Sequence, residues 1–334
     1  MEYQTPDFHN SGYGPGPWWN PDPDYEKRVV KETRTCFSRV GLIYTIFIIV
    51  ANGSQWLAAV FLAESGLMTR ISWNQYMLMS LFSMYPVAVP LTWLLMKTVP
   101  AKGRPVRESW RLGKLTGFFV FCMGALYVGN FVGRVLMLFA GLIKGEPILN
   151  DMEGLITSME PWMILVSAVI AAPVMEELVF RKFLLDRIAG YGHWTAMMVS
   201  GVLFGIVHGN FYQFFYAFFL GVVFAYVYLH TGKIRYTIGF HMLINFMGSI
   251  LPLELLKIVQ KNALIGGILS TGNLMLMIGF IICGVILLAY YWRDLSFPPA
   301  MDGISTKKRI GSVWLNVGMI AFLACGLILF AMSL

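Results

Sequence analysis

The chain has 334 residues, of which 57% are hydrophobic and only 13% are charged. Soluble domains carry about 25% charged residues, so this composition, with a mean hydropathy of +0.66, argues against a soluble enzyme, a disordered protein or a nucleic-acid-binding module. The net charge of +7 does not indicate an acidic partner. The basic residues gather in short clusters between long apolar runs, which is typical of a multi-pass membrane protein.

Residues 1–39 begin with a polar stretch rich in proline, glycine and aromatic residues, which predicts a largely disordered tail. The stretch lacks the early positive charge and short apolar core of a secretion signal. Five basic residues precede the first apolar run, namely Lys27, Arg28, Lys31, Arg34 and Arg39. This cluster predicts a cytoplasmic N-terminus, with a membrane domain over residues 40–334.

Long apolar runs fill the rest of the chain. A bilayer core about 30 Å thick requires about 20 apolar residues in a helix, and nine runs approach that length, although 194–229 is short for two spans. The runs cover residues 40–62, 75–97, 115–143, 161–184, 194–210, 212–229, 235–252, 264–291 and 313–333. We therefore expect an all-α bundle of about eight or nine transmembrane helices, embedded in the lipid bilayer of the cell membrane.

The charges of the connectors alternate in sign. Connector 97–114 carries six basic residues and one acidic residue, which predicts the cytoplasmic side. Connector 144–160 carries four acidic residues and one lysine, which suits the outside. Later basic clusters near residues 181–187, 233–235 and 307–309 return the chain to the cytoplasm.

Three charged residues, Glu176, Glu177 and Arg181, follow an apolar stretch in the run 161–184. An ionised residue at a helix centre costs about 2.5–3.5 kcal/mol, whereas each Leu, Ile or Val contributes only about 0.3–0.6. The cluster must therefore face protein, a water-filled cavity or the interface. Glu177 precedes Arg181 by four residues, the favourable order for an ion pair, which leaves Glu176 unpartnered, as a general base requires. Alternatively, the two acids merely end a span at the cytoplasmic interface.

Two later runs contain further polar side chains among apolar residues. His208 follows Phe204 by one helical turn, and a lone histidine in such a place is commonly a hydrogen-bonded core residue. His241 and Asn245 share one helix face, where they either bond to neighbouring helices or present donors to an oxyanion. Together, two acids, two histidines and an amide suffice to activate a water molecule and stabilise a tetrahedral intermediate.

This set of motifs resembles the CPBP family of intramembrane proteases, which includes the CAAX prenyl protease 2 type and the bacterial Abi-type proteins. The family pattern is Glu-Glu-x-x-x-Arg, then Phe-x-x-x-His, then His-x-x-x-Asn. It stands here, in order, as Glu176-Glu177-x-x-x-Arg181, Phe204-x-x-x-His208 and His241-x-x-x-Asn245. The resemblance marks about residues 160–250 as the catalytic core.

The resemblance implies an intramembrane endopeptidase that acts in CAAX-type or in bacteriocin-related processing. Its substrate would be a peptide or protein, including membrane-associated ones, and not a nucleic acid. Glu176 and His208 would activate the water. His241 and Asn245 would polarise the scissile carbonyl and stabilise its oxyanion.

The resemblance also implies that Glu177 and Arg181 orient the site, with Phe204 in a structural role. Members of the family have been regarded both as metalloproteases and as glutamate-dependent enzymes without a metal, and the residues are compatible with both. Zinc or another divalent metal requires three protein ligands and an open position. The candidate ligands are Glu176, His208 and His241.

Two other functions compete with proteolysis. A proton- or cation-coupled transporter could use Glu176, His208 and His241 to carry the ion, but the sequence has no strong internal repeat. A catalytically silent immunity or scaffold protein could share the fold, but it would not need costly polar groups in apolar helices. In straight helices His208 would lie about 20 Å from the inner boundary. We therefore expect either tilted or partly re-entrant helices over 194–229 or a site near the midplane, and we favour a cavity that opens to the cytoplasm and is bordered by short helices.

Overall fold

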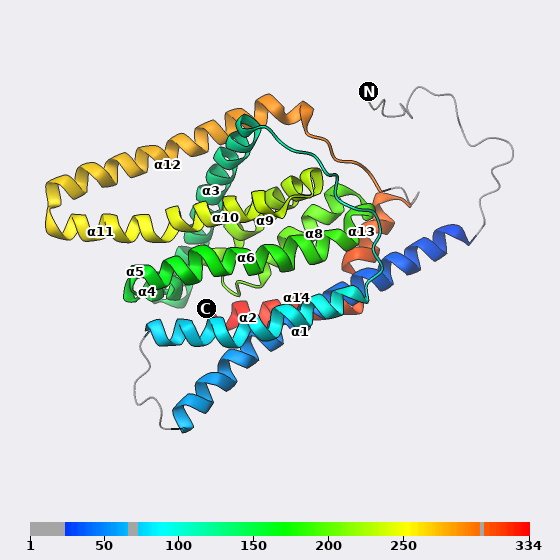
Figure 1. The fold of residues 1–334 in the computed structure, drawn as a ribbon, viewed down its shortest axis with the longest axis horizontal. Helices are drawn as coiled ribbons and strands as arrows, with labels where there is room; N and C mark the ends of the chain where they lie inside the picture. The colour runs from blue at the N-terminus through cyan, green and yellow to red at the C-terminus, as the bar shows by residue number, and fades with distance from the viewer. Residues whose placement is uncertain (1–23, 66–72, 301–303) are drawn as a thin grey trace.

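The computed structural model describes residues 24–65, 73–300 and 304–334, which form helices and connectors without a strand (Figure 1). Five helices have more than 20 residues: α1 (Tyr25–Glu64), α2 (Trp73–Lys97), α3 (Leu112–Lys144), α9 (Phe211–Thr231) and α12 (Ala263–Tyr291). The others with at least eight are α4 (Asp151–Ser158), α8 (His193–Ile206), α10 (Ile234–Asn245), α11 (Leu251–Lys261), α13 (Thr306–Trp314) and α14 (Val317–Met332). The chain is thus an all-α membrane bundle.

One span is assembled from several short helical segments. In chain order they are α5 (Pro161–Ile164), η1 (Leu165–Ala171), α6 (Ala172–Glu177), η2 (Leu178–Phe183), α7 (Leu184–Ile188) and η3 (Ala189–Tyr191). Segments η1 and η2 are π-helical, as is η4 (Phe246–Ile250) between α10 and α11, whereas η3 and η5 (Trp292–Asp294) are single 3₁₀ turns. Changes of helix type therefore concentrate around the predicted catalytic core.

Seven helices of the described chain are long and apolar enough to cross a membrane, or eight if α13 and α14 form one span. The count stays below nine because α8 has only 14 residues, about 21 Å at 1.5 Å per residue. The last apolar run is bent by 60° between α13 and α14. Asn316 stabilises the bend, since its Oδ1 accepts from the N–H of Met319 and its Nδ2 donates to the carbonyl of Ser312.

The N-terminal boundary differs from the sequence prediction. Helix α1 begins at Tyr25, so the basic cluster between residues 27 and 39 lies on a helix and not in an irregular tail. The reason is local, because the chain has neither proline nor glycine between Pro23 and Gly41 and therefore no helix breaker. The predicted disorder of residues 1–23 lies outside the described residues.

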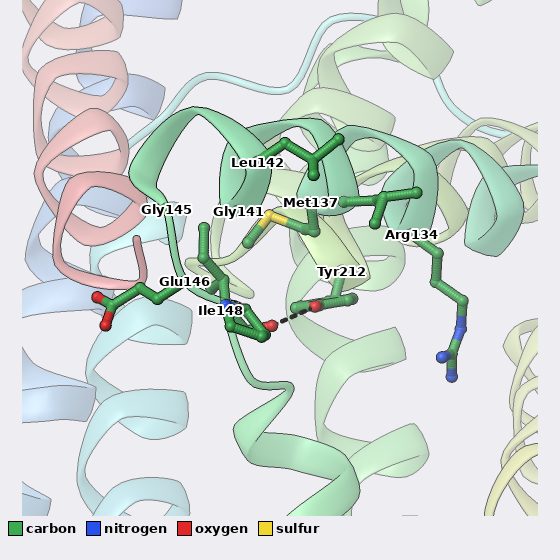
Figure 2. A pocket seen from close by; sticks show the side chains of 10 residues that line it. Arg134, Met137, Gly141, Leu142, Gly145, Glu146, Ile148 and Tyr212 are labelled. Carbon is green, nitrogen blue, oxygen red and sulfur yellow. Dashed lines mark hydrogen bonds between the residues drawn. The ribbon is translucent and has the colours of Figure 1, made fainter.

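A cavity of about 450 Å³ lies where the end of α3 meets the start of α9 (Figure 2). Its lining includes Arg134, Met137 and Tyr212. The hydroxyl of Tyr212 donates to the carbonyl of Ile148 at 2.6 Å, which ties α9 to the connector that follows α3. The cavity contains none of the predicted catalytic residues.

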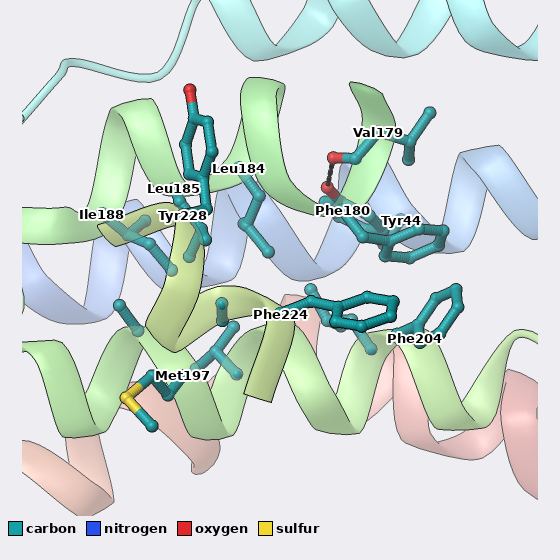
Figure 3. Close-up of a cluster of buried hydrophobic side chains, with 14 of the residues drawn as sticks. Tyr44, Val179, Phe180, Leu184, Leu185, Ile188, Met197, Phe204, Phe224 and Tyr228 are labelled. Atoms are coloured by element: carbon teal, nitrogen blue, oxygen red, sulfur yellow. Dashed lines mark hydrogen bonds between the residues drawn. The ribbon is translucent and has the colours of Figure 1, made fainter. Parts of the chain in front are cut away.

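The protein core surrounds the hairpin of α8 and α9, and its central layer is aromatic (Figure 3). Phe180 of η2 packs against Phe204 of α8 with ring centroids 5.2 Å apart. Tyr44 of α1 donates its hydroxyl to the carbonyl of Val179 at 2.6 Å. These contacts hold the acid-bearing span against α1 and α8.

Glycine permits the close approach of α3 to α9. A Cβ atom built on Gly129 would lie 2.5 Å from the Cα of Tyr216, a distance that no side chain tolerates. Small residues allow membrane helices to approach until their backbones touch. Gly129 therefore fixes the position of α9 at Tyr216.

Replacing Gly129 with alanine should destabilise the fold, because the added methyl group collides with the backbone of α9. Overpacking of this kind costs about 1–3 kcal/mol. Gly117→Ala on the same helix is the matched control, since a Cβ there meets nothing within 4 Å and alanine favours the helix. Thermal unfolding in detergent measures both variants, and equal midpoints would contradict close packing of α3 on α9.

Candidate active site

The two predicted acids lie on α6, a short α-helical segment between two π-helical ones. Pro173 opens α6, and a proline ring clashes with the carbonyl four residues before it and cannot donate a hydrogen bond. The preceding turn accordingly widens into η1, where the N–H of Ala172 bonds to the carbonyl of Ser167, five residues earlier. Such π segments frequently occur at functional sites.

Glu177 and Arg181 form a fully buried ion pair, as their spacing predicts. The Nε of Arg181 lies 3.2 Å from Oε2 of Glu177, and both side chains are 0% exposed. The guanidinium group lies 4.4 Å from the ring centre of Phe204 and 5.2 Å from that of Phe224, two rings drawn in Figure 3. Its Nη atoms have no hydrogen-bond partner in the described part of the chain, so Glu177 and the aromatic faces supply its stabilisation.

The imidazole of His241 lies between the two carboxylates. Its Nδ1 is 3.1 Å from Oε1 of Glu177, and its Nε2 is 3.7 Å from Oε2 of Glu176. An ionised carboxylate only accepts hydrogen bonds, so Nδ1 donates to Glu177. Glu177 thereby fixes the ring with Nε2 directed at Glu176, whose side chain is 23% exposed.

The imidazole rings of His208 and His241 both contact the ring of Phe204 in an edge-to-face arrangement. The centroid of Phe204 lies 4.9 Å from that of His208 and 5.8 Å from that of His241, so the depth difference expected for straight helices does not separate the two histidines. Nδ1 of His208 donates to the carbonyl of Phe204 at 2.7 Å, which leaves Nε2 with its lone pair. The carboxylate of Glu176 lies within electrostatic range of this imidazole.

Asn245 bonds to the π-helical segment η1. In the π register the carbonyl of Ala168 would pair with residue 173, but Pro173 has no N–H. The Nδ2 of Asn245 donates to that carbonyl instead, at 2.7 Å. One amide hydrogen of Asn245 remains for another acceptor, so this contact has the structural role that the sequence left open and does not use up the amide.

The described residues contain no group of three or more His, Cys, Asp or Glu side chains with the geometry of a metal site. His241 directs its two nitrogens at two different carboxylates. As arranged, the three candidate donors do not fit the three-ligand site that zinc requires. The metal stays a prediction, and its candidate ligands are Glu176, His208 and His241.

Sequence reasoning missed two tyrosines beside Glu176. Tyr85 of α2 and Tyr216 of α9 both lie within electrostatic range of its carboxylate, and the ring of Tyr216 is 6.4 Å from that of His208. In sequence each stands among apolar residues, where an aromatic side chain normally packs. Spacing within one run cannot reveal that both reach a third helix.

Residues 158–247 match the family model described as "Type II CAAX prenyl endopeptidase Rce1-like", and this range contains every predicted site residue. The catalytic core predicted from the motifs is thus similar to the CPBP family of membrane proteases. A protein of Bacillus subtilis (strain 168), named "Putative membrane peptidase YdiL", is 26% identical over 187 residues, which cover 52% of this chain and 74% of that protein. No solved structure matches the chain significantly.

The buried pair predicts a large loss of stability when one partner is removed. Arg181→Met leaves the Glu177 carboxylate buried without its cation, which should lower the free energy of unfolding by about 3–5 kcal/mol. Lys182→Met is the matched control. Lys182 pairs with Asp186, and their side chains are 46% and 33% exposed, respectively. Exposed pairs of this kind contribute about 0–1 kcal/mol. Denaturant unfolding in mixed micelles distinguishes them, and similar losses would contradict the buried pair.

The bond from Asn245 to Ala168 predicts coupling between Asn245 and Pro173. Asn245→Ala should cost about 1–3 kcal/mol, because the Ala168 carbonyl is left unsatisfied. In a Pro173→Ala background the restored N–H can reach that carbonyl, so the same change should cost less. The wild type, the two single variants and the double variant form a double-mutant cycle. Strictly additive unfolding free energies would show that Pro173 is not the reason why the Ala168 carbonyl needs Asn245.

Proposed function

We propose that this CPBP protein is an intramembrane endopeptidase in which Glu176 activates water. The observation that carries the proposal is the contrast between two adjacent acids. Glu177 is fully buried and held by Arg181 and His241, whereas Glu176 is partly exposed and lies 3.7 Å from Nε2 of His241. Two titratable groups in different environments are the usual basis for dividing structural and acid–base roles.

Water activation uses Glu176 and His208 together. One hydrogen of the water bonds to the Glu176 carboxylate and the other to Nε2 of His208, whose tautomer is fixed by the bond from Nδ1 to Phe204. This arrangement directs an oxygen lone pair at the scissile carbonyl. Glu176 takes the proton as the oxygen attacks the carbonyl carbon, and general-base assistance of this kind contributes about 10²–10⁴-fold.

Collapse of the tetrahedral intermediate breaks the C–N bond, and the leaving amine takes the proton that Glu176 accepted. The remaining amide hydrogen of Asn245 polarises the carbonyl oxygen during attack, and His241 does so when its Nε2 carries a proton in addition to the one on Nδ1. Glu177 and Arg181 hold His241 in place, and Phe204 packs between the two histidines and the guanidinium group. No step requires a metal, in keeping with the donor geometry.

The substrate proposed is a peptide or protein at the membrane, of the CAAX type or of the bacteriocin-related type. The description of the matching family supports the first, since it names a CAAX prenyl endopeptidase. The name of the Bacillus subtilis relative supports a membrane peptidase more generally. We further propose a cell-membrane location with the N-terminus in the cytoplasm, from the basic residues of α1 and of connector 97–114.

The function is tested by cleavage of a quenched peptide library by the purified protein in nanodiscs. Glu176→Gln and His208→Ala should each lower kcat/KM by about 10²-fold or more. Glu160→Gln is the matched acid control, because Glu160 directly precedes the same span and is exposed, and it should retain wild-type rates. Cleavage that survives in Glu176→Gln would overturn the assignment and favour a transporter or a silent scaffold.

The same preparation decides the metal question. We expect substoichiometric zinc by elemental analysis and cleavage that withstands a chelator. One bound metal per chain that disappears in Glu176→Gln, together with chelator-sensitive cleavage, would replace the metal-free form of the proposal by a metalloprotease.

A further inference from the structure

The loop that follows His208 orients a hydrogen-bond chain that starts at Asn210. The Nδ2 of Asn210 donates to the backbone carbonyl of His208 at 2.8 Å, and its Oδ1 accepts from the backbone N–H of Gln213 at 3.0 Å. A carbonyl can only accept and an N–H can only donate. The two backbone groups therefore leave the amide of Asn210 a single orientation.

This orientation determines the next two members of the chain. The Nδ2 of Asn210 also donates to the side-chain oxygen of Gln213 at 2.8 Å, so the nitrogen of that amide points the other way. It donates to the hydroxyl oxygen of Tyr216 at 2.8 Å. The Tyr216 oxygen is thus used as an acceptor, and no acceptor for its own proton is found within residues 24–65, 73–300 and 304–334.

The free hydroxyl proton is close to the reacting groups. The ring of Tyr216 meets the ring of His208 edge-on at 6.4 Å, and the hydroxyl is within electrostatic range of the Glu176 carboxylate. The backbone of α9 cannot move closer to α3 here, because the Cα of Tyr216 already packs against Gly129. The side chain of Tyr216 therefore lies next to His208 and near Glu176, the two residues proposed to activate the water.

The two predicted oxyanion donors, His241 and Asn245, are already partly engaged in other contacts, so a third hydrogen-bond donor would add to the stabilisation of the oxyanion. Asn245 already spends one amide hydrogen on Ala168, and both nitrogens of His241 face carboxylates. We propose that the Tyr216 hydroxyl donates a hydrogen bond to the oxyanion of the tetrahedral intermediate, with Asn210 and Gln213 as positioning residues. This role rests on the proposed function and adds a catalytic residue to it.

Tyr216→Phe tests the role in the peptide assay. The variant should lower kcat by about 10²–10³-fold, the usual effect of removing one oxyanion donor, with KM unchanged because the bond forms only in the transition state. Tyr212→Phe is the matched control, one helical turn away on α9, since its hydroxyl bonds to Ile148 in the cavity of Figure 2. It should keep wild-type kinetics.

A second variant reverses the hydrogen-bond chain without removing Tyr216. In Gln213→Glu an ionised carboxylate can only accept, so it captures the Tyr216 proton. The activity of this variant relative to wild type should fall as the pH rises through the range in which the carboxylate ionises, which is centred at about 4.3 for an unperturbed glutamate. In the Tyr216→Phe background the same substitution should add no pH-dependent loss, because no hydroxyl proton remains to be captured.

Each outcome decides between the two proposals. If Glu176→Gln is inactive but Tyr216→Phe keeps kcat within about twofold, short of the loss expected for an oxyanion donor, the role of Tyr216 is overturned and the proposed function stands. If Tyr216→Phe loses thermal stability and raises KM, Tyr216 is a packing residue and not a catalytic one. If Glu176→Gln cleaves like the wild type, both proposals fall.

Discussion

The buried pair of Glu177 and Arg181 is the interaction on which the arrangement of the core depends. Separating the two side chains is unfavourable, because an unpaired ion in an apolar interior costs several kcal/mol. The guanidinium group lies beside Phe204 of α8 and Phe224 of α9. The second carboxylate oxygen of Glu177 accepts a hydrogen bond from His241 of α10. One ion pair thereby joins the acid-bearing span to three helices and fixes the face that each presents to the site.

Breaks in the helices provide the polar groups that an unbroken bundle would hide. A membrane interior offers no water to backbone groups, so a carbonyl freed by a helix distortion must find a partner inside the protein. The carbonyl of Ala168 receives no backbone hydrogen bond from Pro173, which has no N–H, and instead accepts one from Nδ2 of Asn245. The end of α8 likewise exposes the carbonyl of His208, which takes the Asn210 amide. Distortions that look like defects in the helices thus hold two of the three motifs in place.

Adjacent positions of α6 receive opposite environments, and this asymmetry is the basis of the proposed chemistry. Glu177 is enclosed and paired, while Glu176 is partly exposed, lies 3.7 Å from His241 and interacts electrostatically with His208 and Tyr216. A carboxylate held among neutral donors and acceptors can exchange a proton, whereas one locked to a guanidinium group cannot. The apolar helices around the cluster strengthen every electrostatic contact within it.

The sequence by itself determined the class of the molecule and the candidate site, because both follow from local spacing. Hydropathy decided an all-α membrane bundle, and the four-residue separation of Glu177 and Arg181 decided their ion pair. Contacts between helices were decided by the tertiary structure, because Asn245 and Ala168 are 77 positions apart and no spacing along one helix relates them. The same holds for the position of Tyr216 beside Glu176, which depends on how closely Gly129 lets α3 approach α9. The start of α1 also differed from expectation, since helix boundaries depend on packing as well as on hydropathy.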